Sequence, residues 1–366
     1  MNITVPTLLI DKKRLVRNVK RMQQKAINNK VALRPHLKTP QSNGVGEWLR
    51  EMGIEKIAVS SLRMAAYYAK GGWKDITVAF PLNVLEMDLV NELAASLQLH
   101  VLVESIETLT ILAASIRHEL GVYIEIDAGY GRTGMPALDM AAITEVVEAI
   151  AQVDLLHFTG FLIHAGHTYK IRRDKGAMLA IHQKHSEVAR ALKAHFLPEF
   201  PRLEISYGDT PSCSMLDDFS AFDELRPGNF VCYDLTQYHI GSCALEDIAV
   251  AMLCPVVALH PKRSEIVVYG GGVHFSKDRI ALENGTISFG RVVDWKGKNW
   301  TISADYSYVR SLSQEHGVIK ASPDLLATTK VGDLLAILPV HSCMTIDLMP
   351  YYLSTEGEEI GIWDKS

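Results

Sequence analysis

The stretch Phe158-Thr-Gly-Phe-Leu-Ile-His164 is a mainly apolar run that ends in a polar side chain. Similar runs recur along the first two thirds of the chain, and helical patterns lie between them. Apolar strands that alternate with helices are typical of a parallel sheet whose faces are covered by helices. Strands are expected at residues 31–37, 56–61, 75–80, 99–104, 122–127, 157–164, 203–207 and 226–233.

This alternation predicts a closed (β/α)8 barrel of the TIM type, with a doubly wound open sheet as the alternative. A short strand at residues 6–10 comes first, and Asp11 is the expected N-cap of a helix that runs to about Asn28. Further helices are expected at residues 62–70, 84–96, 107–120, 138–151 and 172–196.

The pattern changes after about residue 245, where short β-like runs are separated by Gly, Pro, Asn and Asp. Few intervals between these runs are long enough for a crossover helix, which favours antiparallel pairing. We therefore expect a barrel domain over residues 1–245 and a mainly antiparallel β-domain over residues 246–366, with the alternative that the first ten or so residues join the β-domain. The runs lie at residues 249–259, 265–269, 286–289, 299–303, 333–339 and 360–363.

The composition excludes several classes of protein. The 366 residues include 37 Lys and Arg against 42 Asp and Glu, for a net charge of −5, and no basic run stands out, which argues against a nucleic-acid partner. No apolar run reaches about 18 residues, so a membrane span is not expected. The N-terminus lacks the layout of a signal peptide, and five cysteines, an odd number, indicate reduced thiols, so we expect a cytoplasmic protein.

A cluster of basic residues, Arg34-Pro-His36-Leu-Lys38, ends the first strand of the expected barrel. Cationic neighbours favour the neutral amine of a lysine over its ammonium form. A neutral amine is what carbonyl and Schiff-base chemistry requires, so Lys38 is the candidate nucleophile and His36 its candidate helper. The alternative is a basic strand end that faces solvent.

Polar segments follow other strands of the expected barrel, and barrel enzymes collect their functional residues at these strand ends. Glycine amides and a helix N-terminus after strands seven and eight are suited to a phosphate. A helix N-cap for the Gly-Asp-Thr-Pro turn and a core position for His164 are the alternatives. The segments are 127–134 with Arg132, 164–169 with His164, His167 and Tyr169, 207–212 with Gly208 and Thr210, and 226–229 with Gly228 and Asn229.

The segment Leu338-Pro-Val-His341-Ser-Cys343 is the candidate metal site. If it is a strand, residues two apart project from one face, so the His341 imidazole and the Cys343 thiol lie together. This nitrogen and sulfur pair is the kind that zinc prefers, and two ligands leave positions open for water or substrate. The alternative is a strand in which the two side chains alternate by chance. Glu315 is either a partner of the metal ligands or part of a polar loop.

As an ordered set, these segments resemble the D-threonine aldolase and D-serine dehydratase-like enzymes. That family belongs to the pyridoxal-phosphate enzymes with an alanine-racemase-type barrel, and the resemblance covers nearly the whole chain. It is carried by Arg34-Pro-His-Leu-Lys38-Thr, Asp127-x-Gly-x-x-Arg132-x-Gly, Gly166-His-Thr-Tyr169, Gly208-x-Thr-Pro, Leu225-Arg-Pro-Gly-Asn229, Glu315-His-Gly and Pro339-x-His341-x-Cys343.

The resemblance implies a lyase that uses pyridoxal 5'-phosphate (PLP) and zinc and acts on a small β-hydroxy D-amino acid. It implies a Schiff base at Lys38, phosphate contacts around Gly208–Thr210 and Gly228-Asn229, ring contacts from Arg132 and Tyr169, and metal ligation by His341 and Cys343. Dehydratase-like members carry Cys at the second metal position where aldolases typically carry Asp. Cys343 therefore favours D-serine dehydration to pyruvate and ammonia over cleavage of D-threonine or another 3-hydroxy-D-amino acid.

Two departures from the family leave the substrate open. His274 replaces an expected Lys, and Asp209 places a carboxylate beside the expected phosphate, which is unfavourable unless its side chain caps the helix and points away. A racemase, a non-catalytic PLP carrier and a metal-dependent barrel hydrolase are the remaining alternatives. By analogy with the family, we also expect a homodimer.

Overall fold

The computed structural model describes residues 3–365, which form two compact units. The barrel unit comprises residues 20–38 and 46–228, and the β unit comprises residues 3–19, 39–45 and 229–365. The chain therefore passes from one unit to the other four times, between residues 19 and 20, 38 and 39, 45 and 46, and 228 and 229.

Eight parallel strands within residues 3–365 form the barrel unit, as predicted from the strand–helix alternation. They pair in the order β2-β10-β9-β8-β6-β5-β4-β3. A parallel bridge between His36, just after β2, and Ala58 of β3 joins the two ends of this row, so the sheet is a nearly closed barrel and not an open doubly wound sheet. The strands are β2 (Ala32–Leu33), β3 (Lys56–Val59), β4 (Asp75–Pro81), β5 (Gln98–Val103), β6 (Leu120–Asp127), β8 (Leu156–His164), β9 (Glu204–Gly208) and β10 (Glu224–Leu225).

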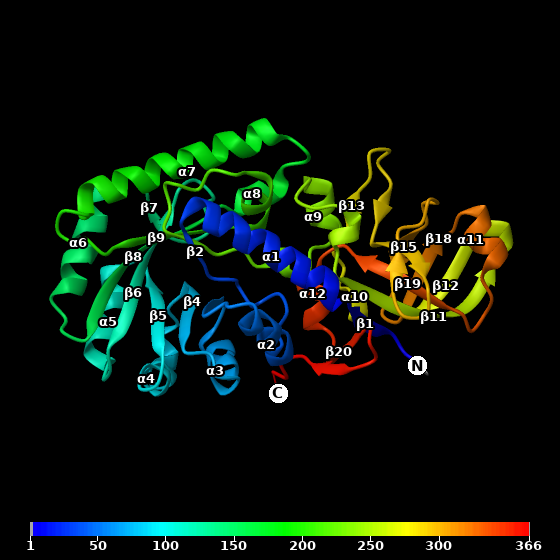
Figure 1. The fold of residues 1–366 in the computed structure, drawn as a ribbon, viewed down its shortest axis with the longest axis horizontal. Coiled ribbons are helices and arrows are strands. Elements are labelled where there is room, and N and C mark those ends of the chain that lie inside the picture. Colours follow the sequence, from blue (N-terminus) through cyan, green and yellow to red (C-terminus); the bar gives the residue numbers. More distant parts are fainter. Residues whose placement is uncertain (1–2, 366) are drawn as a thin grey trace. The chain divides into compact units, whose positions relative to one another are not determined.

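Helices surround the barrel strands (Figure 1). Apolar side chains along β6, from Val122 to Ile126, are fully or almost fully buried on both faces of the strand, as expected where helices cover a parallel sheet. The elements between the strands are α2 (Asn43–Glu51), α3 (Leu62–Lys70), η1 (Val84–Glu86), α4 (Met87–Ala94), α5 (Ile106–Ser115), β7 (Met135–Pro136), α6 (Met140–Ala151), η2 (Gly166–Lys170), α7 (Lys175–Phe196) and α8 (Thr210–Met215). None of the helices within residues 3–365 is both long and apolar enough to cross a membrane.

The eighth strand differs from the prediction of residues 226–233. β10 ends at Leu225, before Pro227 and Gly228, because proline has no N–H for a ladder and glycine weakens a strand. The segment continues as η3 (Asn229–Val231) and α9 (Leu235–Ile240). The helix expected to run to residue 120 also ends earlier, at Ser115, and β6 begins at Leu120.

The β unit contains a second closed barrel, this one antiparallel. Its strands pair in the order β12-β18-β17-β15-β19-β11, and β11 pairs again with β12. The predicted N-terminal strand is β1 (Thr7–Ile10), which pairs with β11 and β20 and so belongs to this unit. The other strands are β11 (Val250–His260), β12 (Glu265–Tyr269), β13 (Ile280–Ala281), β14 (Ile287–Ser288), β15 (Gly290–Trp295), β16 (Trp300–Thr301), β17 (Tyr308–Leu312), β18 (His316–Lys320), β19 (Leu334–Pro339), β20 (Tyr351–Ser354) and β21 (Glu359–Gly361).

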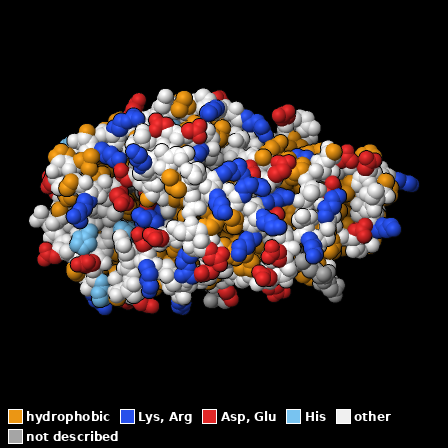
Figure 2. Space-filling view, viewed as in Figure 1, with side chains coloured by type: hydrophobic (Ala, Val, Ile, Leu, Met, Phe, Trp, Pro, Cys, Tyr) orange, Lys and Arg blue, Asp and Glu red, His pale blue; other side chains and the backbone are white. Residues whose placement is uncertain are grey.

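The helices that complete the β unit are short, except for α1 (Lys12–Asn29), whose residues from 20 onward belong to the barrel unit. Asp11 caps α1 as predicted, because its Oδ1 accepts from the backbone N–H groups of Lys13 and Arg14 at 2.9 and 3.1 Å. The remaining helices are η4 (Leu245–Asp247), η5 (Pro261–Arg263), α10 (Gly272–Phe275), α11 (Pro323–Thr328) and α12 (Ser342–Asp347). On the face drawn in Figure 2, basic and acidic side chains are interspersed, in line with a chain that carries no basic run.

A buried ion network fills part of the barrel unit. The Arg34 side chain is 1% exposed, and its Nε lies 2.9 Å from Glu224 Oε2 and its Nη1 2.5 Å from Asp75 Oδ1. Burial raises the pKa of Glu224, but the charges of Arg34 and Lys56 and the hydrogen bonds from Ser206 and Arg34 together outweigh burial, so the net pKa is lowered. Ser206 Oγ donates to Glu224 Oε1 at 2.8 Å and accepts from Arg226 Nε at 3.2 Å, so one carboxylate serves two arginines.

Removal of Arg34 tests this network. We expect Arg34→Met to lower the free energy of unfolding by about 3–5 kcal/mol, because two carboxylates lose their buried partner. Urea titration followed by circular dichroism measures the change. The matched control is Arg63→Met, at a side chain that is 75% exposed and 3.8 Å from Glu86, where we expect a loss below about 1 kcal/mol. Equal losses at the two positions would contradict the network.

Candidate active site

Basic side chains from four strand ends gather around Lys38 in the barrel unit. The Lys38 side chain is exposed, and its backbone N–H donates to Nδ1 of the buried His36 at 3.4 Å. Burial holds the pKa of His36 well below its ordinary value, and the charges of Lys38, Arg226, His164 and Arg132 lower it further. The sequence predicted most of this group, but Arg226 was not among the predicted site residues.

His164, at the end of β8, is held in one orientation. Its Nδ1 donates to the Gly208 carbonyl oxygen at 2.6 Å, and a carbonyl can only accept, so Nδ1 carries the proton and Nε2 the lone pair. Burial, followed by the charges of Arg226, Arg132 and Lys38, lowers the pKa of His164 to about 3. His164 is therefore a neutral hydrogen-bond acceptor at Nε2 among positive charges.

The Gly208–Thr210 turn joins β9 to α8. A Cβ atom on Gly208 would lie 2.6 Å from the Arg226 carbonyl oxygen, so a larger residue would push apart the ends of β9 and β10. Asp209 caps α8, with Oδ1 accepting from Ser212 N at 2.6 Å and from Thr168 Oγ1 at 3.0 Å. The carboxylate thus faces the first turn of its own helix. Because the Asp209 carboxylate caps the helix, its presence in place of the family's neutral residue is compatible with a phosphate at this turn.

Tyr130 is a site residue that sequence reasoning missed. Its ring meets His164 edge-on at 5.7 Å, stacks on His167 at 6.0 Å, and lies 5.4 Å from Arg132 Cζ. The loop that carries Tyr130 is fixed by Asp127, whose Oδ1 accepts from the N–H groups of residues 129, 130 and 131 at 2.8, 2.8 and 3.0 Å. The Asp-x-Gly spacing was visible in the sequence. The sequence did not show that the Tyr130 ring, between two glycines, points toward His164 and His167.

Arg226 is the second missed residue. It is 4% exposed, and its Nη2 donates to the Ile163 carbonyl at 3.2 Å, which ties the end of β10 to the end of β8. Tyr169 lies half-buried in η2, where its carbonyl accepts from Arg172 at 2.9 Å. The signal that could have identified Arg226 was its position one residue after a strand, directly before Pro-Gly.

The predicted metal pair lies at a helix start in the β unit, and the strand expected there ends earlier. β19 stops at Pro339, and His341 is the extended N-cap residue of α12, while Cys343 is in its first turn. The two side chains still meet, because they form a hydrogen bond across this turn. Burial lowers the pKa of His341, but Cys343, its hydrogen bond and Asp234 outweigh burial and raise the pKa to about 10.

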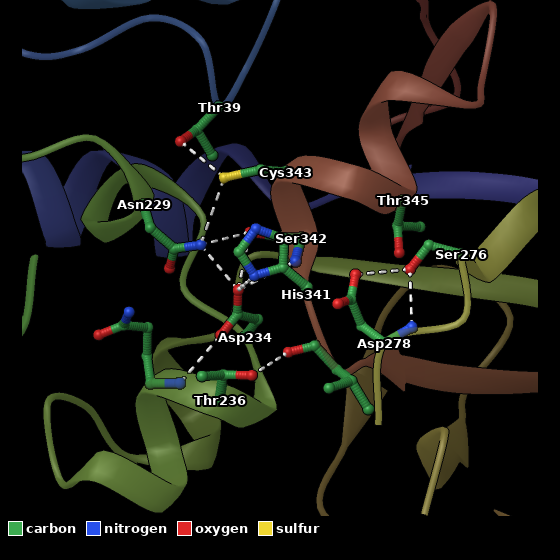
Figure 3. Close-up of polar contacts among 12 residues, drawn as sticks. Thr39, Asn229, Asp234, Thr236, Ser276, Asp278, His341, Ser342, Cys343 and Thr345 are labelled. Atoms are coloured by element: carbon green, nitrogen blue, oxygen red, sulfur yellow. Dashed lines mark hydrogen bonds and ion pairs between the residues drawn. The ribbon is translucent and has the colours of Figure 1, made fainter. Parts of the chain in front are cut away.

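Three residues surround the His341–Cys343 pair within the β unit (Figure 3). Thr39 Oγ1 lies 3.1 Å from Cys343 Sγ, and Asn229 Nδ2 donates to the same sulfur at 3.6 Å. Asp234 Oδ2 lies 3.8 Å from His341 Nδ1. The side chain of Asn229, predicted beside a phosphate, is therefore directed at the predicted metal ligands.

Glu315 does not reach this pair. It lies between β17 and β18, and its Oε2 is 3.9 Å from Nε2 of His274, the second departure from the family. His274 Nδ1 accepts from the backbone N–H of Gly271 at 3.2 Å. His274 and Glu315 thus form a pair of their own.

The donor groups fit the implied cofactors. An exposed lysine near the buried Arg226 and the exposed Arg132 suits an aldehyde that carries a phosphate, since these two cations favour an anion there. An imidazole and a thiol in contact form a borderline-soft pair that suits zinc. Within residues 3–365, no group of three or more His, Cys, Asp or Glu side chains is arranged for a metal.

Comparison with known families matches both parts of the chain. Residues 10–234 match the family described as "Alanine racemase, N-terminal domain". The chain belongs to this family. Residues 249–355 match the "Putative serine dehydratase domain", so the predicted family resemblance is confirmed for this alanine-racemase-like protein.

Relatives of this alanine-racemase-like protein cover its full length. The D-threo-3-hydroxyaspartate dehydratase of Delftia sp. is 27% identical over 377 residues, 100% of this chain and 98% of the relative. The solved structure of this relative superposes on the chain with a TM-score of 0.89 at 26% sequence identity. The match covers 100% of this chain and 99% of the relative's chain. A cysteine-to-alanine variant of a D-threo-3-hydroxyaspartate dehydratase, solved in the metal-free form, gives a TM-score of 0.89 at 27% identity, with 100% and 99% covered.

Other relatives differ in the reaction they catalyse. The D-serine dehydratase of Dictyostelium discoideum is 28% identical over 391 residues, 96% of this chain and 93% of the relative. The 3-hydroxy-D-aspartate aldolase of Paracoccus denitrificans is 26% identical over 384 residues, 100% of this chain and 92% of the relative. Family membership thus leaves dehydration and aldol cleavage open.

The titration of Asp209 gives a test of the α8 turn. Burial raises the pKa of Asp209 from 3.8 to about 6, so folding favours the protonated acid. The stability that this group contributes is full below the unfolded pKa and is lost as pH rises through about 6. We expect Asp209→Asn, which cannot ionise, to gain stability relative to the wild type between about pH 4 and pH 7.5 in urea titrations.

The control for this titration is Asp218→Asn. Asp218 is exposed, and a hydrogen bond from the backbone N–H of Ser220 lowers its pKa, so its contribution appears as pH rises and the trend reverses. A variant at Asp209 that loses stability relative to the wild type at higher pH would contradict the assignment.

Proposed function

We propose that this protein is a PLP- and zinc-dependent lyase that dehydrates a small β-hydroxy D-amino acid. Its most favoured substrate is D-serine, which would yield pyruvate and ammonia. The observation that carries the proposal is the contact between Thr39 Oγ1 and Cys343 Sγ at 3.1 Å, because Thr39 directly follows Lys38 in the chain. A peptide link holds consecutive Cα atoms about 3.8 Å apart, so Lys38 is covalently next to a residue that contacts the Cys343 sulfur.

Lys38 has two tasks in this proposal. Its Nζ would hold the cofactor through the aldehyde, and the free amine of Lys38 would take the α-proton of the substrate. His36 accepts from the Lys38 backbone N–H and stays neutral, so it positions the lysine without adding a charge. When bound, PLP supplies an electron sink for the α-carbon.

The basic side chains around Lys38 hold the anionic groups. Arg226 and Arg132 provide fixed cationic donors for the substrate carboxylate or the cofactor, and Tyr169 is the proposed ring contact. Neutral His164 offers Nε2 as an acceptor, and the stacked Tyr130 and His167 form a wall beside it. The proposed phosphate contacts are Gly208, Thr210 and the backbone of Gly228 and Asn229.

His341 and Cys343 would hold the metal ion. A bound zinc ion is a Lewis acid that makes hydroxide a better leaving group. A thiolate ligand favours zinc over magnesium or calcium, which supports elimination of the β-hydroxyl. Similarity to a D-serine dehydratase and to a D-threo-3-hydroxyaspartate dehydratase supports the same reaction.

The proposal assigns the cofactor to residues 1–245 and the metal to residues 246–366, and it includes a homodimer by analogy with the family. The aldolase uses the same groups but breaks the bond between the α- and β-carbons. A racemase needs a second base and gives His341 and Cys343 no task. A non-catalytic PLP carrier has no use for the β unit.

Product analysis separates these functions. We expect the zinc-loaded protein to convert D-serine to pyruvate and ammonia, as followed by proton NMR. Glycine with formaldehyde would instead establish the aldolase, and L-serine a racemase. Absence of turnover with both D-serine and D-threo-3-hydroxyaspartate would contradict the dehydratase.

Two substitutions test the assigned roles. We expect Lys38→Ala to lose the visible absorbance of the covalent cofactor and to lower kcat/KM at least about 10³-fold. Cys343→Ala keeps that absorbance but loses metal affinity by about 100-fold or more, together with turnover. The control is Cys243→Ala, at another partly exposed cysteine that forms no disulfide. Full activity of Cys343→Ala would overturn the metal role.

A further inference from the structure

The Asp234 side chain is completely buried beside the proposed metal ligands. Asp234 precedes α9, and its Oδ1 caps that helix by accepting from Gln237 N at 2.9 Å. One oxygen is enough for a helix cap. The second oxygen, Oδ2, therefore has a separate set of contacts that the cap does not explain.

Oδ2 of Asp234 accepts from the residue between the two ligands. Ser342 donates to it twice, from the backbone N–H at 2.9 Å and from Oγ at 3.3 Å. Because Ser342 lies between His341 and Cys343, this contact fixes the backbone from which both ligands extend. The same oxygen lies 3.8 Å from His341 Nδ1 (Figure 3).

Asn229 connects the same carboxylate to the thiol. Its Nδ2 donates to Asp234 Oδ2 at 2.7 Å and to Cys343 Sγ at 3.6 Å. Nδ2 also lies 3.0 Å from Ser342 Oγ. The amide orientation is therefore set by Asp234, and the amide in turn limits where the sulfur can lie.

We propose that Asp234 is the positioning residue of the metal centre and sets the orientation of both His341 and Cys343. This inference rests on the proposed function, which assigns the metal to these two residues. The negative charge beside Nδ1 favours the tautomer with the proton on Nδ1, which leaves the Nε2 lone pair for the metal. Histidine ligands generally pair their other nitrogen with a carboxylate or carbonyl in this way, and the partner raises ligand basicity.

The test is the Zn²⁺ affinity of Asp234→Asn, measured on the PLP-loaded protein by competition with a chromophoric chelator. Asparagine can still cap α9 with its oxygen, but its amide faces the donors Asn229 Nδ2 and Ser342 N. We expect Zn²⁺ to bind about 10–100-fold more weakly, with unchanged cofactor absorbance. The absorption spectrum of the Co²⁺-substituted protein gives a second measurement, which does not depend on protein stability. In Asp234→Asn we expect the thiolate-to-cobalt band to remain and the d–d bands to change, because the ligand geometry changes.

The control is Asp174→Asn, at another helix cap. Asp174 caps α7 by accepting from Ala177 N at 2.9 Å and lies in the barrel unit, so we expect wild-type Zn²⁺ affinity and Co²⁺ spectrum. If Asp234→Asn does not fold, Asp234→Ser replaces it, because serine also caps helices but lacks the second oxygen.

The outcomes distinguish the two proposals. A wild-type protein that binds zinc, together with a folded Asp234 variant of unchanged affinity and Co²⁺ spectrum, would overturn the positioning role alone. A wild-type protein that takes up no zinc would overturn the metal centre itself and the positioning role with it.

Discussion

The barrel unit depends on the interaction between the buried carboxylate of Glu224 and two buried arginines. The carboxylate neutralises Arg34 directly and reaches Arg226 through Ser206, so two buried arginines share one buried anion. A guanidinium enclosed by apolar strands is tolerated only with such partners. Because Arg226 also donates to the carbonyl of Ile163, the network extends to the strand end that carries His164. The interior charges thereby fix the place at which the basic groups around Lys38 assemble.

Much of the fold was predictable because it depends on local patterns. Apolar strands and intervening helices identified the barrel, and the ends of its strands bring His164 close to both His36 and Gly208. The prediction of the last barrel strand was wrong. Pro227 and Gly228 lie just after Leu225 and end the hydrogen-bonded strand there, although apolar residues follow them. The strands predicted at residues 249–259 and 333–339 are confirmed as β11 and β19, because almost every residue of both strands is apolar.

The candidate site was less predictable, because its geometry depends on contacts between distant parts of the chain. His341 and Cys343 are two residues apart, so their proximity survives the change from the expected strand to a helix start. Asp234 is 108 residues from Ser342, and no local pattern indicates that they meet. The direction of the Tyr130 ring is likewise set by Asp127 and by packing on two histidines. Sequence reasoning identified reactive groups, whereas the residues that orient them appeared only in three dimensions.

The position of β1 has a consequence for how the chain matures during synthesis. Its residues Thr7 to Ile10 pair with Leu253 to Val250 of β11 and with β20 near the C-terminus. β1 is therefore synthesised long before its partners β11 and β20, and it cannot pair until they have been made. The barrel unit can complete its own strand pairs earlier, since all of them lie within the first two thirds of the sequence. Until β11 and β20 have been made, β1 is an unpaired apolar strand. During that interval the nascent chain is most exposed to incorrect pairing of this strand with other strands.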